Sequence, residues 1–366
     1  MKKGWQTKRL GEVCEIIKGR KPMLKATPSN GDLPYLVAKV MRGSAEAEYA
    51  SVKDRNSVTV ETTETIIICD GSNSGEVFTG FRGVLSSTMG KIAKKAEIDD
   101  DYLRAFLAST FEVFNGAKTG AAIPHLDKEA MYQLQFPFPP LAEQQRIVGL
   151  LDEAFEVLAT AKANAEKNLQ NARALFESHL QSVFTQRGPG WVEKSLGETC
   201  EMYQPKTIGT KDLVPDGPYP VFGANGVIGR YDKFNHEEPQ LLVTCRGATC
   251  GSVNISEPKS WITGNAMVVR PKDHALDLHF LEFVFRGGID ISAAITGAAQ
   301  PQITRTNLSP LLIRYPQSFK EQTRLAEKFE DLTEETQRLA RLYERKLAAL
   351  EALKKSLLHQ AFTGEL

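Results

Sequence analysis

Two short loops of small polar residues, each preceded by a charged side chain, are the part of this sequence best suited to binding a ligand. Asp70 precedes the loop at residues 71–75 (GSNSG), and Arg246 precedes the loop at residues 247–251 (GATCG). Glycine lets a backbone approach a ligand closely. In the major groove of DNA, arginine suits guanine, and asparagine or glutamine suits adenine. A charged residue that differs between the two loops could therefore hydrogen-bond different base edges.

Candidate DNA contacts follow from side-chain type and from position in polar turns. The candidates in and around the base-reading loops are Asp70, Ser72, Asn73, Ser74, Asn225, Arg246, Asn265, Gln300 and Gln302. The candidates for phosphate groups, which lysine and arginine contact without reading sequence, are Lys18, Arg20, Lys21, Lys206, Lys211, Arg230 and Arg305. An ordinary turn or surface position explains each residue taken alone, so the prediction rests on the set.

No set of residues that would support catalysis is found. Residues 223–229 (GANGVIG) form a glycine-rich turn that lacks the GxGxxG spacing of a dinucleotide site, and no GxxxxGK[ST] phosphate loop is present. An amino-methyltransferase motif (Asn-Pro-Pro-Tyr/Phe) and a nuclease core are also absent. The six histidines include no HxxxH pair, and Cys245 and Cys250 lack the second pair of ligands of a zinc site. We therefore expect a non-catalytic protein with no metal and no cofactor of its own.

The sequence repeats once, with a period of about 180 residues, far longer than the roughly 20–50 residues of solenoid repeats. Residues 4–12 (GWQTKRLGE) return as 190–198 (GWVEKSLGE), and residues 119–124 (TGAAIP) return as 296–301 (TGAAQP). Between these landmarks the copies diverge, as in residues 34–39 (PYLVAK) and 219–226 (YPVFGANG). A duplicated frame with dissimilar contents suggests one task performed on two different targets.

The longest repeated stretches, residues 141–184 and 319–362, are expected to form two long helices. Both are rich in strong helix formers, and Gly149 is the one glycine or proline in either stretch. Each follows a proline, which is tolerated at a helix start. At ~1.5 Å per residue, roughly forty residues give a rod of about 60 Å.

Apolar residues in these helices recur at alternating steps of three and four, the pattern of a coiled coil. The seam is predicted to contain Ile147, Leu151, Leu158 and Leu175 in the first helix, and Leu325, Phe329, Leu332, Leu339, Tyr343, Leu350, Leu353 and Leu357 in the second. Small residues in the first helix match large ones in the second, so we expect the two helices to pack on each other. Two separate amphipathic helices, each covering its own domain, are the simpler alternative.

Composition limits the class of protein. The chain has 366 residues, of which 42% are hydrophobic and 25% are charged, which is ordinary for two or three globular domains. No apolar run is long enough to span a membrane, and the first residues lack the apolar core of a signal peptide. An odd count of five cysteines suggests a reducing cytoplasm. The net charge is zero, although residues 1–25 hold eight Lys and Arg against Glu12 and Glu15, so DNA binding is permitted but not indicated by charge.

Short β-branched runs bounded by glycine, asparagine and serine predict strands and tight turns within each globular part. The expected fold class is α+β, with two tandem mixed α/β domains separated by two long helices that pair as an antiparallel coiled coil. The expected boundaries are 1–140 and 188–317 for the domains, and 141–187 and 318–366 for the helices.

Over essentially its whole length the chain resembles the specificity subunit of type I restriction–modification systems. The landmarks are residues 5–12 (WQTKRLGE), 139–148 (PPLAEQQRIV), 219–229 (YPVFGANGVIG), 264–267 (GNAM) and 362–366 (FTGEL). The second copy of the Pro-Pro-Leu-x-Glu-Gln element departs from the pattern, because residues 316–322 (PQSFKEQ) have lost one proline and gained one residue. This difference should alter local packing rather than the role of the helix.

The resemblance implies that each globular domain is a target-recognition domain that reads one half of a split DNA site. The helix pair would set the gap between the halves and dock two modification subunits, which carry S-adenosylmethionine and methylate adenine. Restriction subunits, in a system that has them, would join the complex and cut DNA using ATP and Mg²⁺. The chain itself would be a DNA-binding protein of phage defence in the cytoplasm.

Two other classes of protein remain open from the residues alone. In a two-headed adaptor, the rod would space two protein-binding domains and no DNA would be involved. A standalone enzyme would need motifs that the sequence lacks. Sequence-specific binding to two unlike half-sites would distinguish a DNA-recognition protein from an adaptor. Methyl transfer by the isolated chain would support a standalone enzyme.

Overall fold

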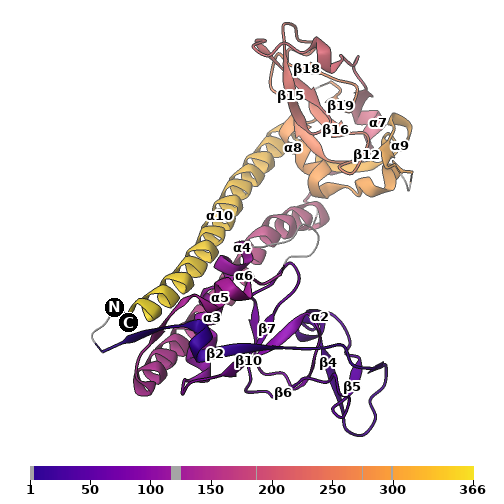
Figure 1. Ribbon diagram of the computed structural model, residues 1–366. Coiled ribbons are helices and arrows are strands. Elements are labelled where there is room, and N and C mark those ends of the chain that lie inside the picture. The colour runs from indigo at the N-terminus through magenta and orange to yellow at the C-terminus, as the bar shows by residue number, and fades with distance from the viewer. Residues whose placement is uncertain (1–3, 117–124, 187, 274, 298–299) are drawn as a thin grey trace. The chain divides into compact units, whose positions relative to one another are not determined.

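The computed structural model describes residues 4–116, 125–186, 188–273, 275–297 and 300–366. The chain divides into two compact units, one formed by Met1–Asn164 with Lys346–Leu366 and the other by Ala165–Arg345. Each unit contains one globular domain and one part of each long helix (Figure 1). Of the repeated segments, residues 119–124 and residues 298 and 299 lie outside the described residues.

The two long helices predicted from the repeat are confirmed. Helix α6 spans Leu141–Gln186, which is 46 residues, and helix α10 spans Phe319–Thr363, which is 45 residues. At roughly 1.5 Å per residue they measure about 69 Å and 68 Å along their axes. Helix α6 begins directly after Pro140, and proline is tolerated at a helix start.

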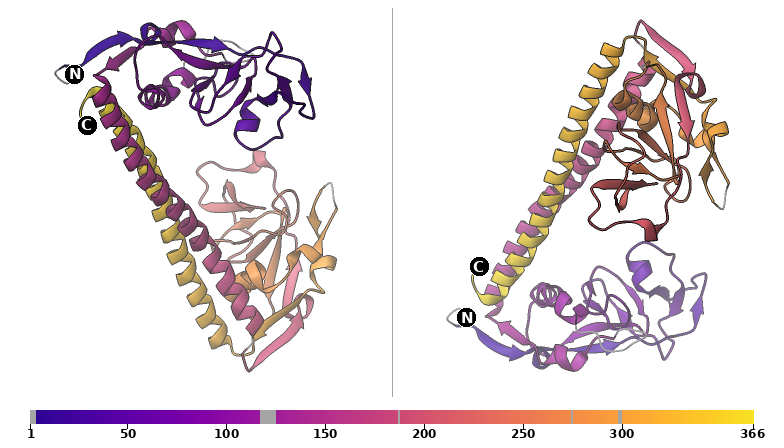
Figure 2. Two further views of the ribbon diagram at one scale, coloured as in Figure 1. Left: turned by 90° about the horizontal axis from the view of Figure 1, so that it is seen from below. Right: turned by 90° about the horizontal axis from the view of Figure 1, so that it is seen from above.

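Within each unit the two helices run antiparallel (Figure 2). In the first unit, Lys162 Nζ of α6 lies 2.7 Å from Glu351 Oε1 of α10, and Arg146 near the start of α6 donates to the carbonyl of Leu366 at 2.9 Å. In the second unit, Arg173 pairs with Glu344 at 2.8 Å. The end of α6 also meets the beginning of α10 there, since the rings of residues 184 and 329 stack with centroids 6.1 Å apart.

The seam between the helices follows the predicted pattern only in part. Leu175 and Leu353 are 50% and 48% exposed, so their assignment to the seam was wrong. A straight helix has 3.6 residues per turn and drifts by about 20° per heptad from a strict 3.5 repeat. In α10 the contact moves on by one residue to Lys354, whose ammonium lies 5.3 Å from the ring of Phe155 of α6. In α6 the residue after Leu175, Phe176, packs on Phe283 of helix α8 (Leu278–Phe283). Of the other predicted positions, Ile147, Leu151 and Phe329 are buried, and Leu158, Leu325, Leu332, Leu339, Tyr343, Leu350 and Leu357 are half-buried.

A common frame of strands is present in both units. Each has a four-stranded antiparallel sheet, in the order β2-β10-β7-β8 in the first unit and β13-β19-β16-β17 in the second. Each also has a two-stranded ribbon that ends at the long helix, β1-β11 and β12-β22. The bounds are β1 Gln6–Arg9, β2 Cys14–Lys18, β7 Ile66–Ile68, β8 Val77–Phe78, β10 Met89–Lys94, β11 Gln135–Phe138, β12 Trp191–Ser195, β13 Cys200–Tyr203, β16 Leu241–Thr244, β17 Val253–Ile255, β19 Ala266–Pro271 and β22 Leu312–Pro316.

Other strands distinguish the two units. The first has a five-stranded sheet in the order β3-β5-β4-β9-β6, whereas the second has a three-stranded sheet, β15-β14-β18, and a short hairpin, β20-β21. The bounds are β3 Leu24–Lys25, β4 Asp32–Leu36, β5 Tyr49–Ser51, β6 Thr59–Val60, β9 Gly83–Leu85, β14 Tyr219–Gly223, β15 Gly226–Tyr231, β18 Trp261–Ile262, β20 Ile295–Thr296 and β21 Gln302–Ile303. The expected duplicated frame with unlike contents is therefore present in the fold.

Short helices cover the sheets. In the first unit they are α1 Leu10–Val13, α2 Ala38–Met41, α3 Asp100–Ser109, α4 Phe111–Gly116 and α5 Lys128–Tyr132. In the second they are α7 Leu196–Thr199, η1 Thr210–Asp212, α8 Leu278–Phe283, η2 Val284–Gly288, η3 Ile291–Ala294 and α9 Arg305–Leu308. The longest of these, α3, is capped by Asp99, the residue before it, whose carboxylate accepts the backbone N–H groups of Asp101 and Tyr102.

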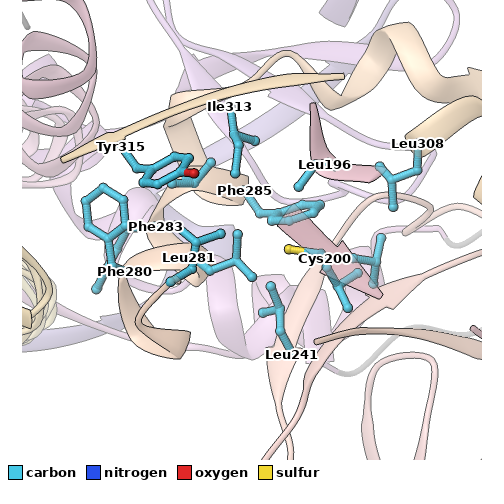
Figure 3. Close-up of a cluster of buried hydrophobic side chains, with 14 of the residues drawn as sticks. Leu196, Cys200, Leu241, Phe280, Leu281, Phe283, Phe285, Leu308, Ile313 and Tyr315 are labelled. Carbon is cyan, nitrogen blue, oxygen red and sulfur yellow. The ribbon is translucent and has the colours of Figure 1, made fainter. Parts of the chain in front are cut away.

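Each core joins a domain to both long helices. In the first unit, Phe106 packs edge to face against Phe136 of β11 and Phe362 of α10, with ring centroids 4.8 and 5.2 Å away. In the second unit, Figure 3 shows Phe280, Phe283 and Phe285 gathered beneath Tyr315 and Ile313 of β22. Burial of such a side chain contributes about 1.5–3 kcal/mol, so each domain is held firmly to its helix pair.

All five cysteines have free thiols, and four of them are buried. In the described parts of the chain, no helix is long and apolar enough to cross a membrane. Among the same residues, no group of three or more His, Cys, Asp or Glu side chains is placed to hold a metal ion.

Candidate nucleic-acid interface

The two polar loops predicted as candidate sites have the same backbone structure. Each follows an inner strand of the shared sheet, β7 or β16, and folds back on the end of that strand. In the first unit the N–H of Gly75 donates to the carbonyl of Ile68 at 2.8 Å, and in the second the N–H of Gly251 donates to the carbonyl of Thr244 at 2.9 Å. The residue before each loop, Asp70 or Arg246, therefore occupies the same point of the fold.

A second segment closes on this point in the first unit. Asp70 and His125 face each other in an isolated antiparallel bridge, next to a hydrogen bond of 2.8 Å from Leu126 N–H to the carbonyl of Cys69. Both carboxylate oxygens of Asp70 have partners, because Oδ2 lies 2.7 Å from Lys18 Nζ and Oδ1 lies 2.8 Å from His125 Nδ1. The Asp70 side chain is 16% exposed, against 42% for Lys18 and 57% for His125. The lysine and histidine thus face solvent, and the carboxylate lies behind them.

These contacts set the charge state of Asp70. Burial by itself would raise the pKa of its carboxyl group. The hydrogen bonds from Lys18 and His125, aided by the charge of Lys18, outweigh burial and hold the pKa below its ordinary value. Asp70 is therefore an anion at neutral pH, and the His125 nitrogen that contacts it, Nδ1, must carry a proton.

The second unit carries different side chains on the same backbone. Arg246 and Gln302 form the isolated bridge, next to a hydrogen bond of 2.9 Å from Ile303 N–H to the carbonyl of Cys245. A hollow of about 280 Å³ opens beside them. Its lining includes Tyr203, Gln204, Arg246, Gln302, Thr304 and Arg305. Three of the predicted DNA contacts, Arg246, Gln302 and Arg305, are therefore brought together.

The turn between β14 and β15 is held by side-chain hydrogen bonds. The amide of Asn225 lies 3.1 Å from Thr244 Oγ1 and 2.9 Å from Thr249 Oγ1. Asn225 is exposed and therefore remains accessible beside the loop that follows Arg246. Arg230 of β15 has a structural task, since its guanidinium donates to the carbonyl oxygen of Pro218 at 2.7 Å.

The remaining candidates are less closely grouped. Asn73 donates to Glu76 at 3.2 Å, and Ser74 is fully buried, so its side chain does not face a ligand. The exposed candidates outside the groups already described are Arg20, Lys21, Ser72, Lys206, Lys211, Asn265 and Gln300. The structure therefore concentrates the predicted contacts at one point in each unit rather than bringing all of them together.

Two residues at these points were missed. His125 was not predicted, although it follows Pro124 as Gln302 follows Pro301 in the repeat. Gln204 was also missed, although it stands four residues after Cys200 as Lys18 stands four residues after Cys14. Alignment of the two copies would have identified both residues.

The side chains at the two points can form hydrogen bonds and ion pairs. The first point offers an ammonium and an imidazole, and the second offers a guanidinium beside two amides. Such groups suit base edges and phosphates, to which arginine and glutamine bind in a directional way. The same position in a common frame therefore has two different binding chemistries.

Comparison with known proteins identifies close parallels in sequence. A family model described as the type I restriction modification DNA specificity domain matches residues 2–169 and 189–345. The specificity subunit of the type I restriction enzyme MjaVIII of Methanocaldococcus jannaschii is 29% identical over 227 residues, which are 58% of this chain and 53% of that protein. The specificity subunit of the Escherichia coli enzyme EcoprrI is 25% identical over 216 residues, covering 56% and 53%. These matches span about half the length of the curated relatives.

Two solved structures have a similar fold. One is a chain of a type I R-M system described in terms of complex assembly and conformational transition, with a TM-score of 0.77, 20% identity and coverage of 100% of this chain and 99% of that one. The other is the HsdS subunit from Thermoanaerobacter tengcongensis, with a TM-score of 0.60, 19% identity and coverage of 100% and 98%. At these identities the likeness establishes the fold.

Proposed function

Since the chain belongs to the family of type I restriction–modification specificity subunits, we propose that it is the non-catalytic DNA-recognition subunit of such a complex. Each globular domain reads one half of a bipartite DNA site, and the paired helices set the gap between the halves. The observation that carries this proposal is the matched pair of bridges, Asp70 with His125 and Arg246 with Gln302. One scaffold that presents two chemistries suits the reading of two unlike half-sites.

The long helices have the properties of a spacer. Their lengths of about 69 Å and 68 Å correspond to about two turns of B-DNA at roughly 34–36 Å per turn. Aromatic packing and a buried glutamine join each domain to its helix, since Gln144 contacts the first domain and Gln322 the second. A domain that is firmly attached to a helix would hold its half-site at a defined place along the DNA.

Catalysis belongs to partner subunits in this proposal. Two modification subunits dock on the helices and supply S-adenosylmethionine for methylation of adenine, and restriction subunits, where the system has them, supply cleavage with ATP and Mg²⁺. The expected cytoplasmic location follows from the same assignment. The zero net charge of the chain is compatible with this arrangement if the partners provide much of the phosphate contact.

Single-molecule sequencing of DNA from cells that express the full chain with its cognate modification subunit tests the proposal. We expect methylated adenines confined to one split motif with a fixed gap. An assembled complex that leaves no such motif would contradict the proposal and favour the two-headed adaptor. Cells expressing the modification subunit alone are the control, and they should show no split motif.

A further inference from the structure

The two bridge points differ in which residue faces outward. In the second unit the residue at the first position, Arg246, is exposed and lines the open hollow. In the first unit the residue at that position, Asp70, is nearly covered, and both of its carboxylate oxygens already have partners. The Asp70 side chain also lies behind the more exposed Lys18 and His125, so a base that approaches this point meets those two side chains first. The two positions are equivalent in the fold but not in their relation to a ligand.

From this difference, and on the premise of the proposed function, we propose that Asp70 is a positioning residue whose neighbours Lys18 and His125 contact the first half-site, whereas Arg246 contacts the second half-site directly. The contact in the first unit therefore comes from β2 and from the segment after residue 124, and the contact in the second unit comes from the loop after β16. One backbone frame supports an indirect reader in one domain and a direct reader in the other.

The hydrogen-bond roles of the first point follow from the Asp70 contact. Because Asp70 is a carboxylate, His125 donates to it through Nδ1, and in the neutral tautomer that carries its proton on Nδ1 the other ring nitrogen, Nε2, is an acceptor. An imidazole acceptor suits the exocyclic amino group of adenine or cytosine, which are the major-groove donors. Lys18 uses one N–H toward Asp70 and has two more for a base acceptor. Loss of Asp70 would free both side chains to rotate and would therefore weaken one specific contact.

The second point has the complementary chemistry. Arginine has only donors, and its guanidinium matches the O6 and N7 acceptors of guanine. Arg246 is held by the bridge to Gln302 at the backbone, so its side chain is not used to close the loop. We therefore expect the second half-site to contain a guanine that depends on Arg246, and the first half-site to contain an adenine or cytosine that depends on His125.

The experiment uses the full chain in complex with its modification subunit and compares the methylation motifs of single variants. The expected result for Lys18→Ala or His125→Ala is loss of discrimination at one position of one half-site, by about 10- to 100-fold against the wrong base. Asp70→Ala should relax that same position. Arg246→Ala should relax one position of the other half-site only. Arg82→Ala removes the cation of an exposed ion pair in the first unit and is the matched control, with an unchanged motif.

Comparison of a double variant with a triple variant shows whether Asp70 positions its neighbours or contacts the base itself. If Asp70 acts through its neighbours, adding Asp70→Ala to Lys18→Ala/His125→Ala has no further effect on the relaxed position, because nothing is left to position. A further loss of discrimination there would show that Asp70 touches the base and would overturn the proposal. Uniform weakening on duplexes of all sequences would also overturn it, because that is the behaviour of a phosphate contact.

The outcomes distinguish this proposal from the function on which it rests. Absence of a split motif with the wild-type complex would contradict the proposed function. A normal split motif that none of these variants changes would leave the function standing and reject the assigned readers. The melting temperature of each variant complex is measured alongside, and a motif change without a change in melting temperature cannot come from unfolding.

Discussion

The side-chain carbonyl of Gln144 accepts the backbone N–H of Asp99 at 2.9 Å, and the same amide donates to the carbonyl of Pro139 at 2.8 Å. Gln144 therefore links the start of α6 to the start of α3 and to the residue that follows β11. Gln322 repeats the arrangement at the start of α10, where it accepts from the N–H of Asp277 at 2.8 Å and donates to the carbonyl of Pro316 at 2.9 Å. Both glutamines are buried. The glutamine of each repeated Glu-Gln pair, Gln144 or Gln322, therefore has a structural role: it attaches the long helix to its domain.

Replacement of Gln144 by leucine should lower the free energy of unfolding by about 2–4 kcal/mol, because one buried and one partly buried backbone group lose their partners. Urea denaturation of the purified chain measures the change. Gln145→Leu is the matched control, since Gln145 is the exposed neighbour on the same helix. Equal stabilities of the two variants would mean that the link contributes nothing.

The seam offers a second test of the packing. Phe329 is 1% exposed and contacts Phe184 of the other helix, so Phe329→Ala should cost about 3–5 kcal/mol. Leu353 is 48% exposed, and Leu353→Ala should stay within about 0.5 kcal/mol of wild type. The same urea experiment compares the two. A large loss for Leu353→Ala would restore it to the seam and contradict the observed drift of the contact line.

The sequence predicts the helices well because their signals are local. Proline marks where α6 starts, and a run of more than forty residues with Gly149 as the one glycine or proline leaves little alternative to a helix. The seam was predicted less well, since a strict heptad ignores the 3.6-residue turn, and Leu175 and Leu353 are exposed although the neighbouring predicted positions Leu350 and Leu357 are half-buried.

The candidate sites show where sequence reasoning ends. Lys18 and Asp70 were predicted as independent contacts, one for phosphate and one for bases. They form an ion pair across 52 residues of sequence, because β2 and β7 belong to one sheet. The sheet of β3, β5, β4, β9 and β6 was not predicted in detail, because four of its five strands have only two or three residues and carry no periodicity. Both failures of prediction concern contacts between segments that are far apart in the sequence.

Thiol reactivity should separate the cysteines. Burial raises the pKa of the Cys14 and Cys200 thiols to about 11, and Cys250 is the least buried of the five. In the folded chain at pH 8, iodoacetamide should therefore modify Cys250 first, and Cys14 and Cys200 only after unfolding, as read by mass spectrometry of peptides. Cys250→Ser is the control and should remove the fast phase. Rapid modification of Cys14 in the folded chain would contradict its burial.

The same thiols predict a loss of stability in alkali. A pKa that is raised in the folded state means that the unfolded chain loses its thiol protons first, so the contribution to stability is complete below the ordinary thiol pKa of about 8.5 and falls as pH rises toward 11. Urea titrations at pH 7 to pH 10 measure the slope. Cys14→Ala should reduce that slope, and an unchanged slope would mean that this thiol does not contribute.

The last prediction concerns exchange of domains. Gln322 binds backbone atoms of the second domain, namely Asp277 N–H and the carbonyls of Ala275 and Pro316. These atoms are present whatever the side chains of the domain are. Residues 190–315 of another family member should therefore dock on α10 without redesign of the helix. We expect the exchanged chain, assembled with the modification subunit, to keep the first half of its methylation motif and the gap, and to gain a new second half.

Two features make this exchange a sharp test. The gap should stay constant because both helices come from the original chain, and the first half should stay constant because Lys18, Asp70 and His125 are untouched. Single-molecule sequencing reads both halves and the gap in one experiment. Simultaneous change of both halves would contradict independent reading by the two domains. A changed gap with the first half intact would instead show that the domain, and not the helix pair, sets the spacing. Gln322→Leu should impair assembly of the exchanged chain and of the original chain alike, because the link uses the same backbone atoms in both.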